Sequence, residues 1–169
     1  MLSFDIRSLE SRAAHVDGTV SPDDPVWEAG DMRPTEPIHV EGRLSAAGPT
    51  RFYFSGRMSG VSEMPCRRCL EDVRVSVSEE EHFIFSAEGE EGSDDPDVFP
   101  FDPHAHELDM TPAIREAWLL AAPAFVQCRE DCKGLCVVCG KDLNQGPCAC
   151  APEIFDPRWE ALKALKEKV

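Results

Sequence analysis

Eight cysteines in a chain of 169 residues constrain this sequence more than any other feature, because six of them lie in one segment, 128–150. The other two form the pair Cys66–Cys69, whose two-residue spacing lets both thiolates bind one tetrahedral metal ion. The pair Cys136–Cys139 repeats this spacing, and the glycine after it permits a tight turn. The pattern predicts structural zinc. The predicted ligands are Cys66, Cys69, Cys128, Cys132, Cys136, Cys139, Cys148 and Cys150.

Eight thiolates correspond to two sites of four cysteines, so two Zn²⁺ ions are expected. The local spacing favours one site made of Cys136–Cys139 and Cys148–Cys150. Cys66–Cys69 would then meet Cys128–Cys132 across the fold and clip a central hairpin to the later segment. The sequence leaves this pairing open. A single residue between Cys148 and Cys150 strains chelation of one ion, so divergence of these two thiols is the alternative.

Other chemistries fit the cysteines less well. Reduced thiols packed as small hydrophobic residues and an iron–sulfur cluster are two alternatives. A thiol-disulfide oxidoreductase using Cys66 and Cys69 is a third, but this pair lacks the helix N-terminus that lowers a thiol pKa in redox folds. Catalytic zinc would keep an open position and usually a His or carboxylate ligand. Because no phosphate loop or nucleophile elbow is present either, we predict no enzymatic activity.

The hydrophobic pattern predicts an α+β fold built on an antiparallel sheet meander. Apolar residues alternate with polar ones over 38–44, 50–61 and 73–85, which indicates three consecutive strands, and a shorter alternation over 2–6 indicates a first strand. Loops are expected over 17–37, which holds six prolines or glycines, and over the acidic stretch 86–110.

Two helices are expected after the sheet. Thr111 and Pro112 resemble a hydroxyl N-cap followed by a first-turn proline, and apolar residues at helical spacing follow to about residue 122. Asp156–Pro157 repeats the signal before a C-terminal helix over 157–168. We therefore expect residues 1–127 to form the sheet and central helix. Residues 128–169 would form the cysteine-rich zinc-binding segment and C-terminal helix, packed on the same domain.

Charge separates two candidate interaction surfaces. Seventeen basic against 32 acidic residues give a net charge of −15, which argues against general binding of a phosphate backbone. Residues 79–109 hold twelve acids and no lysine or arginine, as expected of a solvated loop or of a docking surface for a basic partner. The acids chosen for such docking are Glu79, Glu80, Glu81, Asp94, Asp95 and Asp97. The candidate RNA contacts are Arg51, Arg57, Arg67, Arg68 and Arg74.

The N-terminus and the apolar stretches favour a cytoplasmic protein. The first residues contain no basic region followed by an apolar run, so no signal peptide is expected. The longest apolar stretch, 117–126, is interrupted by Pro123 and is too short to span a bilayer, so no membrane association is predicted. In the cytoplasm thiols stay reduced, and clustered cysteines there indicate metal binding or redox chemistry.

With these motifs described, the sequence resembles the bacterial YceD family over roughly residues 35–168. The resemblance lies in Cys66-Arg-Arg-Cys69-Leu, in the block 128–140 with its Cys-Lys-Gly-Leu-Cys core, in Asp-Leu-Asn at 142–144 and in Asp-Pro-Arg-Trp at 156–159. Members of this family are described as large ribosomal RNA subunit accumulation proteins, with relatives in plastids.

The resemblance implies a non-enzymatic role in 23S rRNA accumulation and large-subunit assembly, but it supplies no mechanism. The expected partner is a large-subunit precursor, reached through a basic ribosomal protein or through 23S rRNA itself. Charge favours the protein route, since twelve uncompensated acids outweigh a net charge of +2 over residues 51–78. A zinc-binding regulator unrelated to ribosomes is the remaining alternative.

Overall fold

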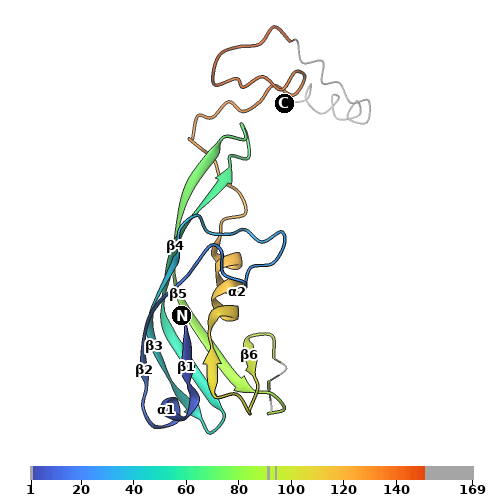
Figure 1. The fold of residues 1–169 in the computed structure, drawn as a ribbon. Helices are drawn as coiled ribbons and strands as arrows, with labels where there is room; N and C mark the ends of the chain where they lie inside the picture. The colour runs from blue at the N-terminus through green and yellow to red at the C-terminus, as the bar shows by residue number, and fades with distance from the viewer. Residues whose placement is uncertain (1, 91, 94, 151–169) are drawn as a thin grey trace, which may run out of the picture.

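The computed structural model describes residues 2–90, 92–93 and 95–150, and its centre is a five-stranded sheet (Figure 1). The strands lie in the order β2-β3-β4-β5-β6, the first four antiparallel and the last parallel to β5. Their bounds are β2 Ala14–Val20, β3 Ile38–Gly48, β4 Arg51–Pro65, β5 Asp72–Ala87 and β6 Val98–Phe101. The α+β class and the expected meander, formed by β3, β4 and β5, are confirmed.

The hairpin of β4 and β5 is the longest feature of the sheet. Phe52, Phe54 and Met58 are buried on its inner face, as the alternation predicts, and Tyr53, Ser55 and Arg57 lie on the outer face. β3 accompanies β4 only as far as Ser59, whereas β5 pairs with β4 down to Pro65. The last turn of the hairpin therefore projects beyond the rest of the sheet toward the cysteine-rich segment (Figure 1).

Helix α2, Thr111–Ala121, packs on the inner face of the sheet and confirms the predicted central helix. Its Trp118 is fully buried and donates from Nε1 to the carbonyl oxygen of Met32 at 2.8 Å. The predicted hydroxyl cap is wrong: the N-cap is Met110, and the Thr111 hydroxyl instead donates to Asp109. Proline lies in the first turn as expected, because the unpaired N–H groups there make its missing donor harmless.

The N-terminus joins the segment that precedes α2. Strand β1, Ser3–Asp5, pairs antiparallel with β7, Glu107–Asp109, in a second, two-stranded sheet. The short helix α1, Ile6–Ser11, follows directly, and the Asp5 carboxylate caps it by accepting from the Ser8 amide at 2.7 Å. The strand predicted over 2–6 is therefore shorter than expected, since Ile6 already begins the helix.

Both predicted loops contain strands. β2 runs through Val20, because Val16 and Val20 enter the core at alternating positions despite the glycine between them. The stretch 86–110 contains the end of β5 together with β6 and β7. Phe99 and Phe101 of β6 pack against the core, which outweighs the local proline and acid content. The predicted helix over 157–168 lies outside the described residues.

The buried residues form two separate clusters. The larger lies between the sheet, α2 and the N-terminal segment. The smaller lies at the hairpin tip and consists of Cys66, Cys69 and Cys132, with Cys128, Val73 and Leu135 packed against it. Over the part of the chain described, no helix combines the length and apolarity needed to cross a membrane.

Candidate metal centre

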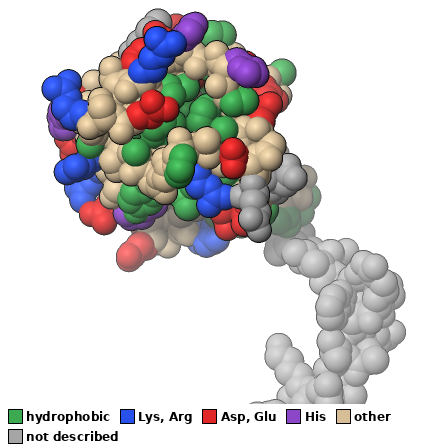
Figure 2. Space-filling view, turned by 90° about the horizontal axis from the view of Figure 1, so that it is seen from below, with side chains coloured by type: hydrophobic (Ala, Val, Ile, Leu, Met, Phe, Trp, Pro, Cys, Tyr) green, Lys and Arg blue, Asp and Glu red, His purple; other side chains and the backbone are tan. Residues whose placement is uncertain are grey.

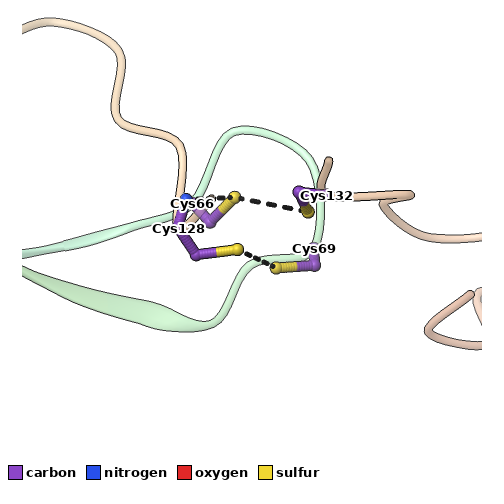
Figure 3. Close-up of side chains that lie close together, drawn as sticks. All are labelled: Cys66, Cys69, Cys128 and Cys132. Atoms are coloured by element: carbon purple, nitrogen blue, oxygen red, sulfur yellow. Dashed lines mark hydrogen bonds between the residues drawn. The ribbon is translucent and has the colours of Figure 1, made fainter. Parts of the chain in front are cut away.

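The first cysteine tetrad lies at the tip of the β4–β5 hairpin (Figure 3). The turn between the strands supplies Cys66 and Cys69, and the segment after α2 supplies Cys128 and Cys132. All four sulfurs lie within 4.8 Å of one another, with Cys66 Sγ to Cys132 Sγ at 4.0 Å and Cys69 Sγ to Cys128 Sγ at 3.6 Å. Zn–S bonds of about 2.3 Å place tetrahedral sulfurs about 3.8 Å apart, so the tetrad fits zinc.

Backbone pairing brings the two halves of this tetrad together. Cys66 forms a parallel bridge with Val126, and the Arg67 amide donates to the Val126 carbonyl oxygen at 2.8 Å. The Cys128 amide then donates to Cys66 Sγ at 3.4 Å. The segment that leaves α2 is therefore fixed alongside the hairpin tip, which is the clip expected from the cysteine spacing.

The second tetrad consists of Cys136, Cys139, Cys148 and Cys150, whose sulfurs also lie within 4.8 Å of one another. Cys136 Sγ and Cys148 Sγ are 3.3 Å apart. Cys148 and Cys150 do not diverge, so the structure groups the eight thiols as the local spacing favours. Cys139 is exposed and the other three are half-buried, whereas three thiols of the first tetrad are buried.

The two Cys-x-x-Cys turns share one backbone geometry. In the first, the Cys66 amide donates to Glu71 O at 2.8 Å and the Leu70 amide donates to Cys66 O at 2.9 Å. The Arg68 amide points at Cys66 Sγ from 3.5 Å. Leu70 has a φ of 63° and is the only non-glycine residue with positive φ in the described part of the chain. Such a backbone outlier marks a turn held in place by its surroundings.

The second turn repeats these contacts, with glycine in the place that Leu70 takes in the first turn. The Cys136 amide donates to Lys141 O and the Gly140 amide donates to Cys136 O, both at 2.8 Å. The Val138 amide donates to Cys136 Sγ at 3.4 Å. Gly140 adopts the left-handed conformation, with φ 71°, that Leu70 adopts in the first turn. Two turns of the same form, each aiming N–H groups at a sulfur, are typical of thiolate sites for metals.

The thiol pKa values diverge within each tetrad. The backbone N–H of Cys69 lowers the pKa of Cys66 to about 6, and the backbone N–H of Cys139 lowers that of Cys136 to about 6. Burial raises the pKa of Cys128 to about 12, and the neighbouring Cys139 raises that of Cys150 to about 12. Four thiols so close together resist full ionisation, and a dication would relieve that repulsion.

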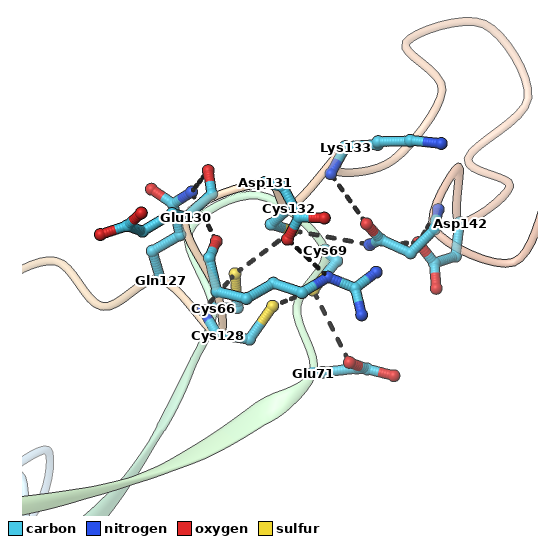
Figure 4. Close-up of polar contacts among 12 residues, drawn as sticks. Cys66, Cys69, Glu71, Gln127, Cys128, Glu130, Asp131, Cys132, Lys133 and Asp142 are labelled. Atoms are coloured by element: carbon cyan, nitrogen blue, oxygen red, sulfur yellow. Dashed lines mark hydrogen bonds and ion pairs between the residues drawn. The ribbon is translucent and has the colours of Figure 1, made fainter.

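Polar groups surround the first tetrad (Figure 4). The Asn144 side chain donates from Nδ2 to Cys132 Sγ at 3.5 Å. Burial raises the pKa of Cys132, but this bond and the Gly134 amide outweigh it, so the pKa is lowered overall. Sequence reasoning missed Leu70 and Asn144 as parts of the centre. Only the Asp-Leu-Asn motif in the family resemblance pointed toward Asn144.

The five candidate RNA-contact arginines do not gather in one patch. Arg51 is the first residue of β4 and Arg67 lies two residues past its other end, and a strand of this length extends about 45–50 Å. Arg57 pairs with Glu80 at 3.2 Å, and Arg74 pairs with Glu36. Figure 2, which views the end opposite the tetrads, shows blue and red side chains interspersed over the described residues.

The candidate docking acids gather along one edge of the sheet. Glu79, Glu80 and Glu81 lie in the part of β5 that no described strand borders on its outer side, since β6 pairs only with Ile84–Ala87. Burial, followed by repulsion from Glu79, raises the pKa of Glu81. Asp97 immediately precedes β6 and Asp95 lies two residues before Asp97; the first residue of β6 pairs with Ile84. Asp94 lies outside the described residues. The acidic edge is defined here as Glu79, Glu80, Glu81, Asp95 and Asp97.

Comparison with known proteins identifies relatives over most of the chain. A protein named large ribosomal RNA subunit accumulation protein YCED homolog 1, chloroplastic, from Arabidopsis thaliana is 32% identical over 97 residues, 52% of this chain and 30% of the relative. The uncharacterized protein YlbN of Bacillus subtilis is 28% identical over 165 residues, 96% of this chain and 93% of the relative.

A third relative, the uncharacterized protein Rv2926c of Mycobacterium tuberculosis, is 34% identical over 112 residues, 64% of this chain and 52% of the relative. No solved structure gives a significant match. The model of the family described as "Large ribosomal RNA subunit accumulation protein YceD" matches residues 54–166, a span that contains all eight cysteines. The chain therefore belongs to the YceD family.

Proposed function

We propose that this protein supports 23S rRNA accumulation and large ribosomal subunit assembly as a non-enzymatic interaction protein. The family match over residues 54–166, together with the printed name of the plant relative, carries this proposal. The site chemistry supports it, because closed sets of four thiolates are typical of structural metal sites rather than catalytic ones.

The metal we propose is Zn²⁺, one ion in each tetrad. In the first, Cys66 and Cys69 would share the ion with Cys128 and Cys132, so the ion would join the hairpin tip to the segment after α2. In the second, the four ligands would close a compact loop of their own. Zinc supplies cross-links here, and their expected effect is to hold the exposed surface of this tip in one shape.

The partner we propose is a basic ribosomal protein of a large-subunit precursor, bound at the acidic edge. The unpaired side of β5 offers backbone donors and acceptors to an extended segment, and its acids would attract basic residues of that segment. Direct contact with 23S rRNA is the second route. It has weaker support, because the arginines lie far apart, whereas Glu79, Glu80 and Glu81 are consecutive. The Arg57–Glu80 pair takes one residue from each candidate surface.

The burial of the first tetrad argues against thiol redox catalysis. Cys66 is 0% exposed and Cys69 is 6% exposed, so a substrate disulfide has no access to either sulfur in this fold. Alkylation with and without a chelator separates the two functions. Zinc-held thiols react only after chelation, whereas a redox pair reacts at once.

The decisive experiment is sedimentation of the tagged protein on low-salt gradients, combined with measurement of 23S rRNA in depleted cells. We expect co-migration with large-subunit precursors, lost as salt rises, and reduced 23S rRNA on depletion. Migration only as a free protein, with normal 23S rRNA, would reject the ribosomal role and favour a zinc-binding regulator unrelated to ribosomes.

The acidic edge is tested in the same gradients with the variant Glu79→Gln/Glu80→Gln/Glu81→Gln. We expect it to lose most of its association with precursors. The matched control neutralises three exposed acids elsewhere, Glu10→Gln/Glu116→Gln/Glu130→Gln, with the same change in net charge, and should retain association. Equal behaviour of the two variants would remove the acidic edge as the docking surface.

A further inference from the structure

A side chain from within the second tetrad's loop contacts a ligand of the first tetrad. Asn144 lies in residues 140–147, the loop between Cys139 and Cys148. Its Nδ2 nevertheless donates to Sγ of Cys132, which belongs to the other tetrad, at 3.5 Å. A residue from the loop that lies between ligands of one tetrad therefore touches a ligand of the other.

The orientation of the Asn144 amide is fixed by further hydrogen bonds. Its Oδ1 accepts from the Lys133 amide at 2.8 Å, immediately after Cys132 in the chain. Asp142 Oδ1 accepts from Asn144 N at 2.9 Å and from Asn144 Nδ2 at 2.7 Å. Because the oxygen is engaged by a donor, the nitrogen must be the atom that faces the sulfur.

The backbone of the segment between the two tetrads also contacts both of them closely. The Leu143 amide donates to Gly134 O at 2.9 Å, and the Leu135 amide donates to Arg68 O at 2.9 Å. Gly134 has a φ of 74°, and a Cβ on it would lie 2.9 Å from Arg68 O. Only glycine fits this approach. The segment linking the tetrads thus rests on the first Cys-x-x-Cys turn on one side and on loop 140–147 on the other.

We propose that Asn144 is a positioning residue that couples the two metal sites. Metal in the second tetrad fixes loop 140–147, which holds the Asn144 amide against Cys132, and this contact raises the metal affinity of the first tetrad. An N–H group facing a thiolate disperses the negative charge that four thiolates leave around one Zn²⁺. The inference rests on the metal binding proposed above and is independent of the ribosomal role.

Coupling of this kind is reciprocal. If the loaded second tetrad tightens the first, then metal in the first tetrad tightens the second by the same factor. Outer-shell hydrogen bonds to metal ligands typically change metal affinity about 10–100-fold, which sets the size of the effect expected here.

The test measures Zn²⁺ affinity of the full chain by competition with a chromophoric chelator. We expect Asn144→Ala to weaken the first tetrad about 10–100-fold. Asn144→Asp should weaken it further, because it keeps the acceptor for the Lys133 amide but turns a carboxylate oxygen toward Cys132. The matched control Ser11→Asp makes the same charge change at an exposed residue of α1, outside loop 140–147, and should leave the affinity of the first tetrad within about threefold of wild type.

A double-mutant cycle isolates the coupling. In Cys148→Ser/Cys150→Ser, which leaves only the first tetrad able to hold Zn²⁺, we expect that site to be weakened by a factor similar to that of Asn144→Ala. Adding Asn144→Ala to this background should then lower the Zn²⁺ affinity of the first tetrad little further. Circular dichroism checks that the sheet is intact in each variant.

Two results overturn the inference while leaving metal binding in place: an unchanged first site in Asn144→Ala, or additive losses in the cycle. A wild-type chain that binds fewer than two Zn²⁺ would instead reject the metal sites themselves. None of these outcomes affects the co-sedimentation test of the ribosomal role.

Discussion

At the scale of single residues, Gly60 sets how closely α2 approaches the sheet. A Cβ at Gly60 would lie 2.7 Å from Cζ3 of Trp118 and 3.3 Å from Cγ1 of Ile38. The indole is fully buried and holds a hydrogen bond to Met32 O, so the ring cannot retreat without losing that bond. The absent side chain of Gly60 is therefore part of the core packing.

We expect Gly60→Ala to destabilise the protein by about 1–3 kcal/mol through overpacking. The measurement is urea unfolding, followed by tryptophan fluorescence. Ser59→Ala is the matched control, because its side chain lies on the outer face of the same strand and should change stability by less than about 0.5 kcal/mol. A Gly60→Ala variant as stable as the control would show that α2 can shift to make room.

The candidate centre was partly predictable from its residues. Cysteine spacing is a local property, so both Cys-x-x-Cys turns and the favoured grouping of the thiols follow from the sequence. Leu70 and Asn144 were not predictable in the same way. The positive φ of Leu70 belongs to the same local turn that Gly140 completes in the second pair, but a leucine gives no sign of that conformation. The contact of Asn144 with Cys132 depends on how loop 140–147 folds back on the segment before it.

At the scale of elements, pattern strength decided which predictions succeeded. Strands β3 to β5 and helix α2 are long enough to show a clear period, and all were predicted. β6 and β7 have four and three residues, too few for a period to be visible. The second half of β2 was assigned to a loop because residues 17–37 are rich in proline and glycine. The pairing of β2 with β3 along seven residues shows that tertiary contacts prevailed.

Arg115 of α2 pairs with two acids of the loop over 21–37: with Asp31, and with Glu28 at 3.3 Å. Arg115 donates to both carboxylate oxygens of Asp31, from Nε at 2.7 Å and from Nη2 at 3.0 Å. This side chain, followed by the Glu28 amide, lowers the pKa of Asp31 below its ordinary value of 3.8. The folded state thus binds the Asp31 proton less readily than the unfolded state. Its contribution to stability is complete above the ordinary value and is lost as pH falls through the lower folded pKa.

We expect Asp31→Asn to lower the urea midpoint at neutral pH, because Arg115 loses the carboxylate that it holds with two hydrogen bonds and keeps only the exposed Glu28 as a charged partner. The difference from wild type should stay constant down to about pH 5 and narrow at lower pH, because the unfolded wild-type chain takes up the Asp31 proton before the folded protein does. Asp23→Asn, an exposed acid of the same loop, serves as the control and should show a small difference throughout. A difference in urea midpoint between wild type and Asp31→Asn that stays constant from pH 7 to pH 3 would contradict the assigned role of the ion pair.

At the scale of the whole molecule, the two buried clusters differ in what can stabilise them. The main core joins sheet, α2 and N-terminus and contains no cysteine. The tip cluster consists largely of thiols, with few apolar residues to bury. The composition of the chain does not reveal that the two clusters are separate. They are separate because the β4–β5 hairpin extends beyond the end of β3. A cluster this small buries little apolar surface, so we expect a bound metal ion to contribute more to its order than to that of the main core.

Removing the metal should therefore loosen the tip and spare the sheet. With excess chelator, we expect amide hydrogen exchange to accelerate in residues 66–71 and 126–150, because both Cys-x-x-Cys turns lose their cross-links. Exchange in β2, β3 and α2 should stay within the range of the metal-loaded protein, because the main core is independent of the thiols. The same chelator saturated beforehand with Zn²⁺ controls for direct effects on the protein. Uniform loss of protection across sheet and tip would show that the two clusters fold as one cooperative unit.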